Sequence, residues 1–465
     1  MPKNNTHVPR TPDEISAGEG MMPWGDVTRR SLRNFRIGTE TMPPALIRAL
    51  IQIKHAAADA NAALGRLSDK KRDAIRTVCE ELLAHPRPEY FPLKVWQTGS
   101  GTQTNMNVNE VIAGLAAVPL HPNDDVNKSQ SSNDVMPTAI HMAVLSGITR
   151  RLLPALDGLI DTLDELAAAN PTVIKTGRTH LQDAVPLRFA QEVGAWRSAL
   201  MRNREMLLPA IDSLRDLAAG GTAVGTGLNT HPDYPARFID ALNAITGEHF
   251  RSDPDKFKAL SMKTEVAAVH AHLKILAGDL TKIAEDVRFL SSGPRCGYGE
   301  INIPANEPGS SIMPGKVNPT QCEALLMVAA QVTGNDVTVS IAASRGNFQL
   351  NVYMPVIAYN VLQSIDLLAD AVRSFDVNCC RGITVNADVM ANNLARSLMT
   401  VTALNPVIGY EKGAEIVKTA LRDNITVRAA ALAADIIDAD TFDHLTDPER
   451  AIGPSSDTTD DPRKP

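Results

Sequence analysis

A polar loop with the sequence EPGSSIMPGKVNPTQCE, at residues 307–323, holds the side chains best suited to chemistry. Glycines and prolines punctuate the loop and separate two serines from Lys316 and Asn318. This punctuation favours a mobile turn rather than a regular element. Hydroxyl, amide and ammonium groups donate hydrogen bonds to anions. The loop is therefore expected to bind a small carboxylate and to close over it as a lid.

Four polar clusters, including this loop, each come directly before a segment with a helical pattern. They are TGSGTQTNMN (98–107), SQSSND (129–134), TGRTHLQDAVP (176–186) and GSSIMPGKVNP (309–319). A helix N-terminus presents unsatisfied N–H groups and a partial positive charge, both of which favour anions. The clusters therefore predict a site for a small dicarboxylate, assembled from several helix N-termini.

Ordinary helix capping is the alternative interpretation of any one cluster, because Ser, Thr and Asn are common caps and turn residues. In the loop, Asn318 is predicted to be the N-cap of the next helix, with Pro319 at its first position and Gln321 as a capping-box partner. The recurrence of four such clusters, one with His180 and one with Lys316, favours a binding site.

Long helices are expected to position these clusters. From Met262 to Leu290, apolar residues alternate at spacings of four and three, the period of a coiled-coil seam. Further helical patterns cover 139–166, where Pro154 predicts a bend, and 187–217, 321–343 and 356–372. No strand ladder is evident. The sequence therefore predicts an all-α fold with a central bundle of long helices, and the seams suggest that chains also pack on one another.

Changes in composition along the chain predict three domains. Residues 1–130 should form an N-terminal mixed helical domain with substrate-binding loops, and 131–387 the central long-helix bundle. Residues 388–465 should form a small C-terminal helical domain. It ends in the polar tail PSSDTTDDPRKP, which is expected to be disordered.

The overall composition excludes several classes of partner. A formal net charge of -7 argues against nucleic acid or an anionic membrane surface. No apolar run approaches the roughly 18 residues of a membrane span. The first twenty residues lack the apolar segment of a secretory leader. A cytoplasmic protein is expected.

Neither a metal site nor a nucleotide site is predicted. The five cysteines show no metal-ligand spacing, and reduced structural thiols are expected. His270 and His272 are two residues apart on a helix and so face different directions. The run GGTAVGTG at 220–227 lacks the ending of a phosphate-binding loop, and a tight passage between helices is expected there.

These motifs resemble those of the fumarase/aspartase superfamily, and within it the class II fumarases. The resemblance covers nearly the whole chain, in order. Besides the loop, it includes SGTQTNMNVNEV, HPNDDVNKSQSSNDVMPTA, TGRTHLQDAVPL, GGTAVGTGLNTHP, SSGPRCGYGEI, GNFQLNV and LNPVIGYEK. It implies three all-α domains, a homotetramer whose core is the central helices, and no metal or other cofactor. It also implies reversible hydration of fumarate to (S)-malate through an aci-carboxylate intermediate, a step of the tricarboxylic acid cycle.

The resemblance also implies roles for individual residues. Ser310 would remove the carbon proton, Lys316 would stabilise the charge that develops, and His180, paired with Glu323, would handle the hydroxyl or water. Each active site would combine residues from three chains, with His180 and Ser310 coming from different subunits. The substrate-binding residues would be Ser100, Thr102, Asn105, Ser131, Ser132, Asn133, Thr179, Lys316 and Asn318, with His121, Asn123 and Asp124 at a second dicarboxylate site.

Other interpretations remain open at this point. Aspartate ammonia-lyases are similar to this chain but carry Gln at the position of His180 and Thr at that of Ser132. A catalytically inactive relative is a third possibility, against which Ser310, His180 and Lys316 all speak. For His121 the alternative is a turn cap. Departures such as WGDVTRRS and PLRFAQE touch no catalytic position but leave open whether methylated fumarates are also substrates.

Overall fold

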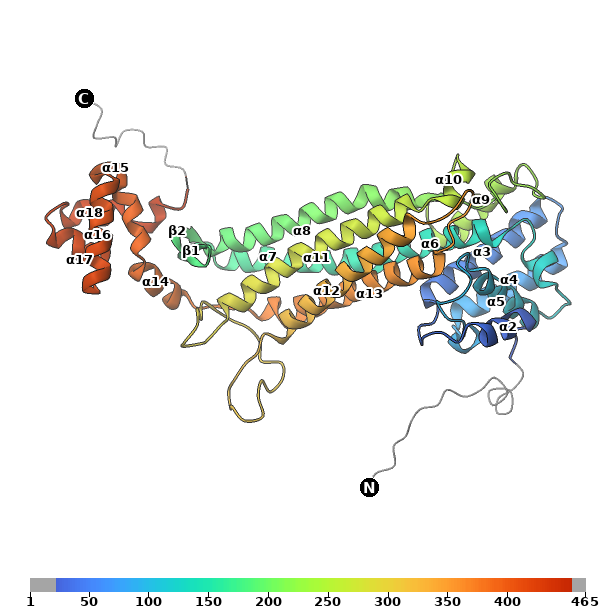
Figure 1. The fold of residues 1–465 in the computed structure, drawn as a ribbon, viewed down its shortest axis with the longest axis horizontal. Helices are drawn as coiled ribbons and strands as arrows, with labels where there is room; N and C mark the ends of the chain where they lie inside the picture. The colour runs from blue at the N-terminus through green and yellow to red at the C-terminus, as the bar shows by residue number, and fades with distance from the viewer. Residues whose placement is uncertain (1–21, 454–465) are drawn as a thin grey trace, which may run out of the picture. The chain divides into compact units, whose positions relative to one another are not determined.

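The computed structural model describes residues 22–453 (Figure 1). The predictions made for the first twenty residues and for the polar tail concern segments outside this range. The described helices are α2 (Asp26–Asn34), α3 (Pro44–Ala63), α4 (Asp69–Ala84), α5 (Thr102–Leu115), α6 (Ser132–Gly147), α7 (Leu153–Ala169), α8 (Phe189–Asp212), α9 (Tyr234–Thr246), α10 (Lys256–Ser261), α11 (Thr264–Leu290), α12 (Thr320–Ala343), α13 (Met354–Asn378), α14 (Ala387–Arg396), α15 (Asn405–Ile408), α16 (Tyr410–Asp423), α17 (Val427–Ala433) and α18 (Ala439–Leu445).

The chain divides into two compact units. The first comprises Met1–Pro154, Asn203–Ala277 and Val328–Ala369, and the second comprises Ala155–Arg202, Gly278–Met327 and Asp370–Pro465. Helices α8, α11, α12 and α13 each contribute residues to both units. The division into three domains stays a prediction.

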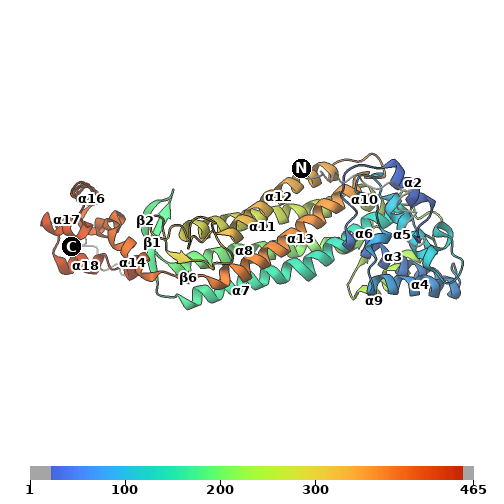
Figure 2. The same cartoon turned by 90° about the horizontal axis from the view of Figure 1, so that it is seen from below.

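The predicted long helices are confirmed. Within each unit, segments of α8, α11, α12 and α13 lie alongside one another (Figures 1 and 2). The apolar stripe of α11 forms part of each unit's core, and its first predicted member, Met262, lies before the helix and is exposed. The buried stripe residues are Val266, Val269, Leu273, Leu276, Leu280, Ile283, Val287 and Leu290.

The helix predicted around Pro154 is interrupted where expected. Helix α6 ends at Gly147, and a π-helical turn, η3 (Ile148–Leu152), leads into α7. Proline has no N–H and clashes with the carbonyl four residues earlier, which favours a widened turn at that point. The interruption therefore lies just before Pro154.

A β-hairpin replaces the predicted helix N-terminus in the cluster TGRTHLQDAVP. Strands β1 (Ile174–Thr179) and β2 (Gln182–Arg188) pair antiparallel, with Thr179 opposite Gln182. Helix α8 begins only at Phe189. The expectation of a sequence without paired strands was wrong here, because the segment is too polar and irregular for a clean two-residue alternation. The other strands are two-residue segments: β3 (Asp216–Leu217) pairs with β4 (Arg251–Ser252), and β5 (Ile301–Asn302) with β6 (Thr384–Val385).

The first unit is organised around α3, which contacts α4, α6 and α9. This helix is rich in alanine and apolar on most of its circumference, and it begins with Pro44, which suits a first helical position. Its residues Leu46, Leu50 and Ile53 are buried. The end of the second unit has a separate small core made by α16, α17, α18 and the 3-10 segment η6 (Leu398–Leu404), in which Ile416 and Phe442 are buried.

Helix α12 differs from the expectation that no apolar run approaches the length of a membrane span. Of the described helices, it alone is long and apolar enough to cross a membrane by length and composition, with a mean hydropathy of 1.3 and 33% of the tested stretch buried. Its exposed apolar residues include Met327, Val337 and Ile341. Because the helix also carries Glu323 and buried Asp336, its polar residues interrupt the apolar pattern.

The five cysteines are all free thiols. Cys79, Cys322, Cys379 and Cys380 are buried, and Cys296 is exposed. Burial raises the pKa of the Cys79 thiol, so that this side chain remains protonated and unreactive. The predicted structural role thus fits the four buried cysteines.

Candidate active site

The loop between α11 and α12 places two backbone donors at the oxygen of Ser310. The hydroxyl oxygen accepts hydrogen bonds from the N–H groups of Ile312 (3.2 Å) and Met313 (3.1 Å). Ser310 is half-buried, whereas Ile312 and Met313 are exposed. Two N–H dipoles directed at one oxygen stabilise negative charge on it. This geometry therefore suits a serine that must act in its deprotonated form.

Lys316 and Asn318 are held together in the same loop. The Lys316 ammonium donates to Asn318 Oδ1 at 2.6 Å, and Asn318 Nδ2 donates to the carbonyl of Gly309 at 2.7 Å. A Cβ added at Gly309 would lie 2.0 Å from the carbonyl oxygen of Lys316, so only glycine permits this approach. The loop thus gathers a base candidate, a cation and an amide in one short segment.

The predicted capping role of Asn318 was wrong. Helix α12 begins at Thr320, and the Asn318 side chain binds within the loop instead of capping the helix. Gln321 also takes another partner, because its Oε1 accepts from the hydroxyl of Ser374. The loop's own contacts therefore use Asn318, and Gln321 instead joins α12 to α13.

His180 lies in the two-residue turn of the β1–β2 hairpin. His180 and Leu181 have φ angles of 56° and 60°, a left-handed conformation that costs energy in residues other than glycine. This turn type suits the twist of a two-residue hairpin. Thr179 and His180 are both exposed. The backbone therefore presents the imidazole at the tip of the hairpin.

Ion pairs fix the base of this hairpin. Buried Lys175 binds Glu192 and Glu300, and Arg178 binds Glu300 while lying 4.3 Å from the ring centre of Tyr298. Burial alone would raise the pKa of Glu300, but hydrogen bonding and charge from Arg178 and Lys175 keep it below its usual value. The charged network connects the hairpin to α8 and to the residue that precedes β5.

The predicted partner of His180 is Glu323. Glu323 is exposed on the first turn of α12, and among the described residues no ion pair joins it to His180. Their pairing stays a prediction, and both side chains are open to other groups.

The first unit brings together two of the other predicted clusters. Ser100 and Thr102 exchange a hydroxyl hydrogen bond of 2.7 Å at the start of α5, and Asn105 Nδ2 donates to Ser132 Oγ at 3.0 Å. Ser131 is the N-cap of α6, in a capping box completed by Asp134. Hydroxyl and amide groups from two helix N-termini therefore lie side by side.

The glycine-rich run at 220–227 forms hydrogen bonds with residues at the start of α6. Asp134 accepts hydrogen bonds from the N–H groups of Gly220 and Thr222, and Asn133 Nδ2 donates to the carbonyl of Ala223. Burial raises the pKa of Asp134 to about 6, although these backbone donors favour its charged form. The run connects β3 to α9, so the prediction of a passage between two helices was wrong on one side, where a two-residue strand precedes the run.

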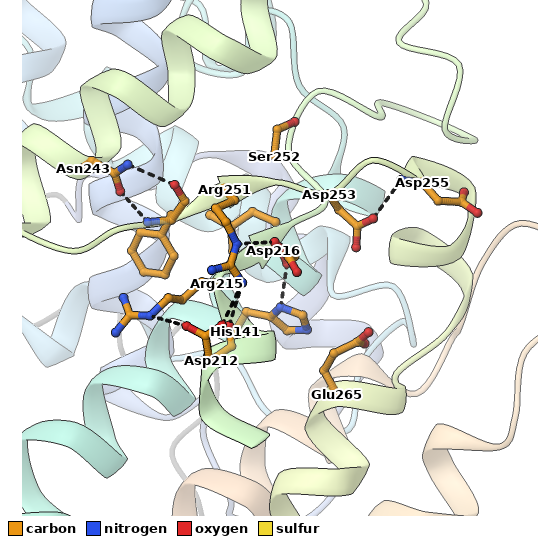
Figure 3. A network of polar contacts seen from close by, with 12 residues as sticks. His141, Asp212, Arg215, Asp216, Asn243, Arg251, Ser252, Asp253, Asp255 and Glu265 are labelled. Carbon is orange, nitrogen blue, oxygen red and sulfur yellow. Dashed lines mark hydrogen bonds and ion pairs between the residues drawn. The ribbon is translucent and has the colours of Figure 1, made fainter. Parts of the chain in front are cut away.

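A further polar network secures the chain that leads into this run (Figure 3). His141 Nδ1 lies 3.0 Å from the carbonyl of Asp216, whose carboxylate accepts from Arg251 at 2.8 Å. Arg251 also binds Asp212. Burial lowers the pKa of His141, and the nearby Glu265 opposes that shift. The network ties α6 to β3 and β4, and so fixes where the glycine-rich run begins.

His121 acts as a turn cap. Its Nδ1 accepts from the N–H of Asp124 at 3.1 Å, at the start of the π-helical turn η2 (Pro122–Val126). His121, Asn123 and Asp124 are all exposed. The alternative interpretation of this motif is thus realised, and the second dicarboxylate site stays a prediction.

Comparison with known proteins then identifies the family. A lyase family model matches residues 21–334, and a model of the fumarase C C-terminus matches residues 401–453. The chain is 51% identical over 442 residues to fumarate hydratase class II of Bacillus subtilis, covering 93% of this chain and 96% of the relative. The chain belongs to the class II fumarase family.

Other class II fumarases agree with this assignment. The enzyme of Helicobacter pylori strain 26695 is 50% identical, with coverage of 93% of this chain and 96% of the relative. The crystal structure of recombinant class II fumarase from Schistosoma mansoni superposes with a TM-score of 0.89 at 39% identity, covering 92% of this chain and 95% of the other. The all-α class II fumarase fold is therefore confirmed.

Sequence reasoning missed the residues behind the first-unit cluster. Lys54 of α3 is completely buried and binds Asn127 and Gln130. Its only signal in the sequence is a lysine within the apolar run ALIQIKHAAA.

No group of three His, Cys, Asp or Glu side chains placed to hold a metal ion occurs within residues 22–453.

Proposed function

We propose that the chain is a fumarate hydratase, which adds water to fumarate to give (S)-malate and catalyses the reverse reaction. The observation that carries this proposal is the Ser310 oxygen with its two N–H donors, in a loop that also holds Lys316 and Asn318. Membership of the class II fumarase family supports it. The geometry at Ser310 and the family membership also favour an active enzyme over an inactive relative.

Removal of a carbon proton is the difficult step in the direction of dehydration. The proton leaves the methylene carbon of malate, and negative charge accumulates on the adjacent carboxylate as an aci-carboxylate. Donors fixed around that carboxylate stabilise this state more than the substrate, as catalysis requires. Lys316 and Asn318 would supply these donors, and closure of the loop would exclude water.

Ser310 would be the base that takes this proton. A serine hydroxyl is a weak base in water, so its deprotonated form needs stabilisation. The N–H groups of Ile312 and Met313 provide that stabilisation before substrate arrives. In the resting loop the oxygen is thus already arranged to carry charge.

His180 would act on the other carbon of malate. As the carbon–oxygen bond breaks, a protonated imidazole gives its proton to the leaving hydroxyl, which departs as water. In hydration the same group takes a proton from the attacking water. A carboxylate beside the ring, the role proposed for Glu323, fixes the tautomer and favours the charged form. Such a positioned acid or base contributes roughly 10² to 10⁴ in rate.

The substrate carboxylates would bind to hydroxyl and amide groups of the predicted polar clusters. Those of the first unit converge at the start of α5 and α6, and Thr179 stands beside His180 on the hairpin. The proposed set is Ser100, Thr102, Asn105, Ser131, Ser132, Asn133, Thr179, Lys316 and Asn318.

We also propose a homotetramer, located in the cytoplasm, with active sites shared between subunits. Exposed Met327, Val337 and Ile341 on α12 support packing between chains, because a long helix seldom leaves such residues in water. The exposed positions of His180 and Glu323 are consistent with partners from a second chain.

The decisive experiment follows the ultraviolet absorbance of fumarate with purified protein. We expect fumarate to be consumed without ammonium, and malate to appear in equal amount. His180 and Ser132 favour this result, since aspartate ammonia-lyases carry other residues at these two positions. Consumption that requires ammonium would replace the hydratase with an ammonia-lyase, and no consumption under either condition would support an inactive relative.

A further inference from the structure

A buried lysine lies behind the proposed substrate-binding residues of the first unit. Lys54 on α3 has an exposed fraction of 0%, and its ammonium donates to Asn127 Oδ1 (3.0 Å) and Gln130 Oε1 (2.9 Å). A buried ammonium is costly unless its hydrogens are bound. Retaining one at this position therefore calls for an explanation.

A chain of hydrogen bonds runs from Lys54 to Ser132. Asn127 Oδ1, which accepts from Lys54, also accepts from Asn105 Nδ2 at 3.1 Å. The same Asn105 amide nitrogen donates to Ser132 Oγ at 3.0 Å. Asn105 is completely buried, and Ser132 is 8% exposed. Two amides thus connect the lysine to a residue of the proposed binding site.

The lysine sets the direction of every bond in this chain. An amide can present either its oxygen or its nitrogen, but Lys54 offers hydrogens, so Asn127 must turn its oxygen toward it. The Asn127 nitrogen then donates to the Gln130 carbonyl at 3.2 Å. Asn105 must in turn present its nitrogen to the Asn127 oxygen. The remaining Asn105 hydrogen is donated to Ser132, whose oxygen is therefore an acceptor.

This direction does not depend on the charge of the lysine. Burial lowers the pKa of Lys54 to about 7, while the charge of Asp134 opposes that shift. A neutral amine still has two hydrogens, one for each oxygen it contacts. The Gln130 oxygen is also fixed in place, because the Gln130 nitrogen donates to the carbonyls of Val126 and Lys128.

We propose that Lys54 is a positioning residue that, through Asn127 and Asn105, directs the hydroxyl hydrogen of Ser132 toward a substrate carboxylate. Since the Ser132 oxygen already accepts, its own hydrogen is free to donate, and within the described residues no acceptor is bound to it. A carboxylate only accepts hydrogen bonds, so this direction is the one that recognition requires. The inference rests on the proposed function for the identity of the ligand.

A double-mutant cycle of Lys54→Met with Ser132→Ala tests this coupling. The readouts are the inhibition constant of succinate, a dicarboxylate that cannot be dehydrated, and the KM of fumarate. We expect Lys54→Met to weaken succinate binding roughly tenfold when Ser132 is present, as for a lost hydrogen bond to a charged group. In the Ser132→Ala background, the same change should alter succinate binding less than about threefold.

Lys263→Met is the matched control. Lys263 is also buried, and its ammonium donates to the carbonyls of Ala259, Leu260 and Met262. None of these partners is a proposed binding residue. Lys263→Met therefore removes a buried ammonium without touching the chain to Ser132, and should change succinate binding less than about twofold in either background.

The cycle has outcomes that overturn the inference. Equal losses from Lys54→Met in both backgrounds would show that Lys54 supports folding and does not act through Ser132. If Lys54→Met does not fold, Asn127→Leu breaks the same chain with the lysine retained, and should show the same dependence on Ser132. Failure of the wild-type protein to hydrate fumarate would overturn the proposed function instead, and succinate dissociation constants measured by titration calorimetry would still report on the coupling.

Discussion

At the scale of single residues, the main feature of this fumarase-family chain is the hydroxyl oxygen of Ser310. It accepts two backbone hydrogen bonds, which would stabilise negative charge on it. The two N–H groups at Ser310 cannot be predicted from residue types, because every residue except proline supplies an N–H and only the course of the loop directs it. The sequence identified the serine, the lysine and the asparagine. It could not show that Asn318 would bind the Gly309 carbonyl, since that contact depends on how the chain returns on itself.

Ser310→Ala should lower kcat by roughly 10² to 10⁴, because it removes the proposed base. Thermal unfolding should shift little, since the half-buried side chain binds only loop N–H groups. Ser311→Ala is the control. Ser311 is the exposed serine next to Ser310, and it lies outside the proposed machinery. Near-normal turnover of the Ser310 variant would restrict the loop to a binding role.

Lys263 should make stability depend on pH. Burial lowers its pKa to about 7, whereas in the unfolded chain the value is near 10.5. Between these values the unfolded chain binds the extra proton, so the free energy of unfolding rises with pH. From pH 7 to pH 9, wild type should gain about 2 kcal/mol relative to Lys263→Met.

Chemical denaturation at one protein concentration measures this difference at each pH. A gap between the two proteins that stays constant from pH 7 to pH 9 would show that Lys263 keeps an ordinary pKa. Below pH 7 Lys263 is protonated in both the folded and the unfolded chain. The difference in the free energy of unfolding between wild type and Lys263→Met should then stop changing with pH.

At the scale of elements, the long helices were predictable and the hairpin was not. Apolar spacing over many turns identified α11 and α12 to within about two residues at each end. Residues 174–188 give no such signal, because β1 and β2 are short and their polar residues bind specific partners such as Glu300. The hairpin moves His180 away from the helix N-terminus on which the sequence placed it.

The hairpin turn makes Leu181→Gly a stabilising change. Leu181 has a φ of 60° and is 58% exposed, so glycine would relieve strain and lose little buried surface. We expect the free energy of unfolding to rise by about 0.5–1 kcal/mol. Val185→Gly, an exposed position within β2, should instead lower it by about 0.5–1 kcal/mol.

Thermal unfolding of the two variants and the wild type distinguishes these effects. A loss of stability in both variants would mean that the turn is not strained at Leu181. Activity should be retained in Leu181→Gly if the ion pairs of Lys175 and Arg178 fix the hairpin well enough to place His180.

At the scale of the whole molecule, the residues proposed for the active site are distributed over the sequences of both units. Ser310, Lys316 and His180 belong to the second unit, whereas Asn105, Ser132 and their neighbours belong to the first. The proposal of sites shared between subunits is a statement about assembly, and a mixture of two inactive variants can test it.

The His180→Asn and Ser310→Ala variants should each be nearly inactive when assembled as the proposed homotetramer. When equal amounts are unfolded together and refolded, a given site receives an intact His180 with probability one half, and an intact Ser310 independently with the same probability. About one quarter of the sites should then be intact, provided that assembly is symmetric and unbiased. Activity at the mutant baseline in verified mixed tetramers would mean that one chain supplies both residues.

The exposed Cys296 has a practical consequence. Four of the five thiols are buried, so a maleimide dye should attach to the folded chain at a single place without any engineering. That place lies on the same connection between α11 and α12 as Ser310. A fluorophore there would report in real time whether the connection moves when a dicarboxylate is added, and a spin label would report the distances between equivalent chains.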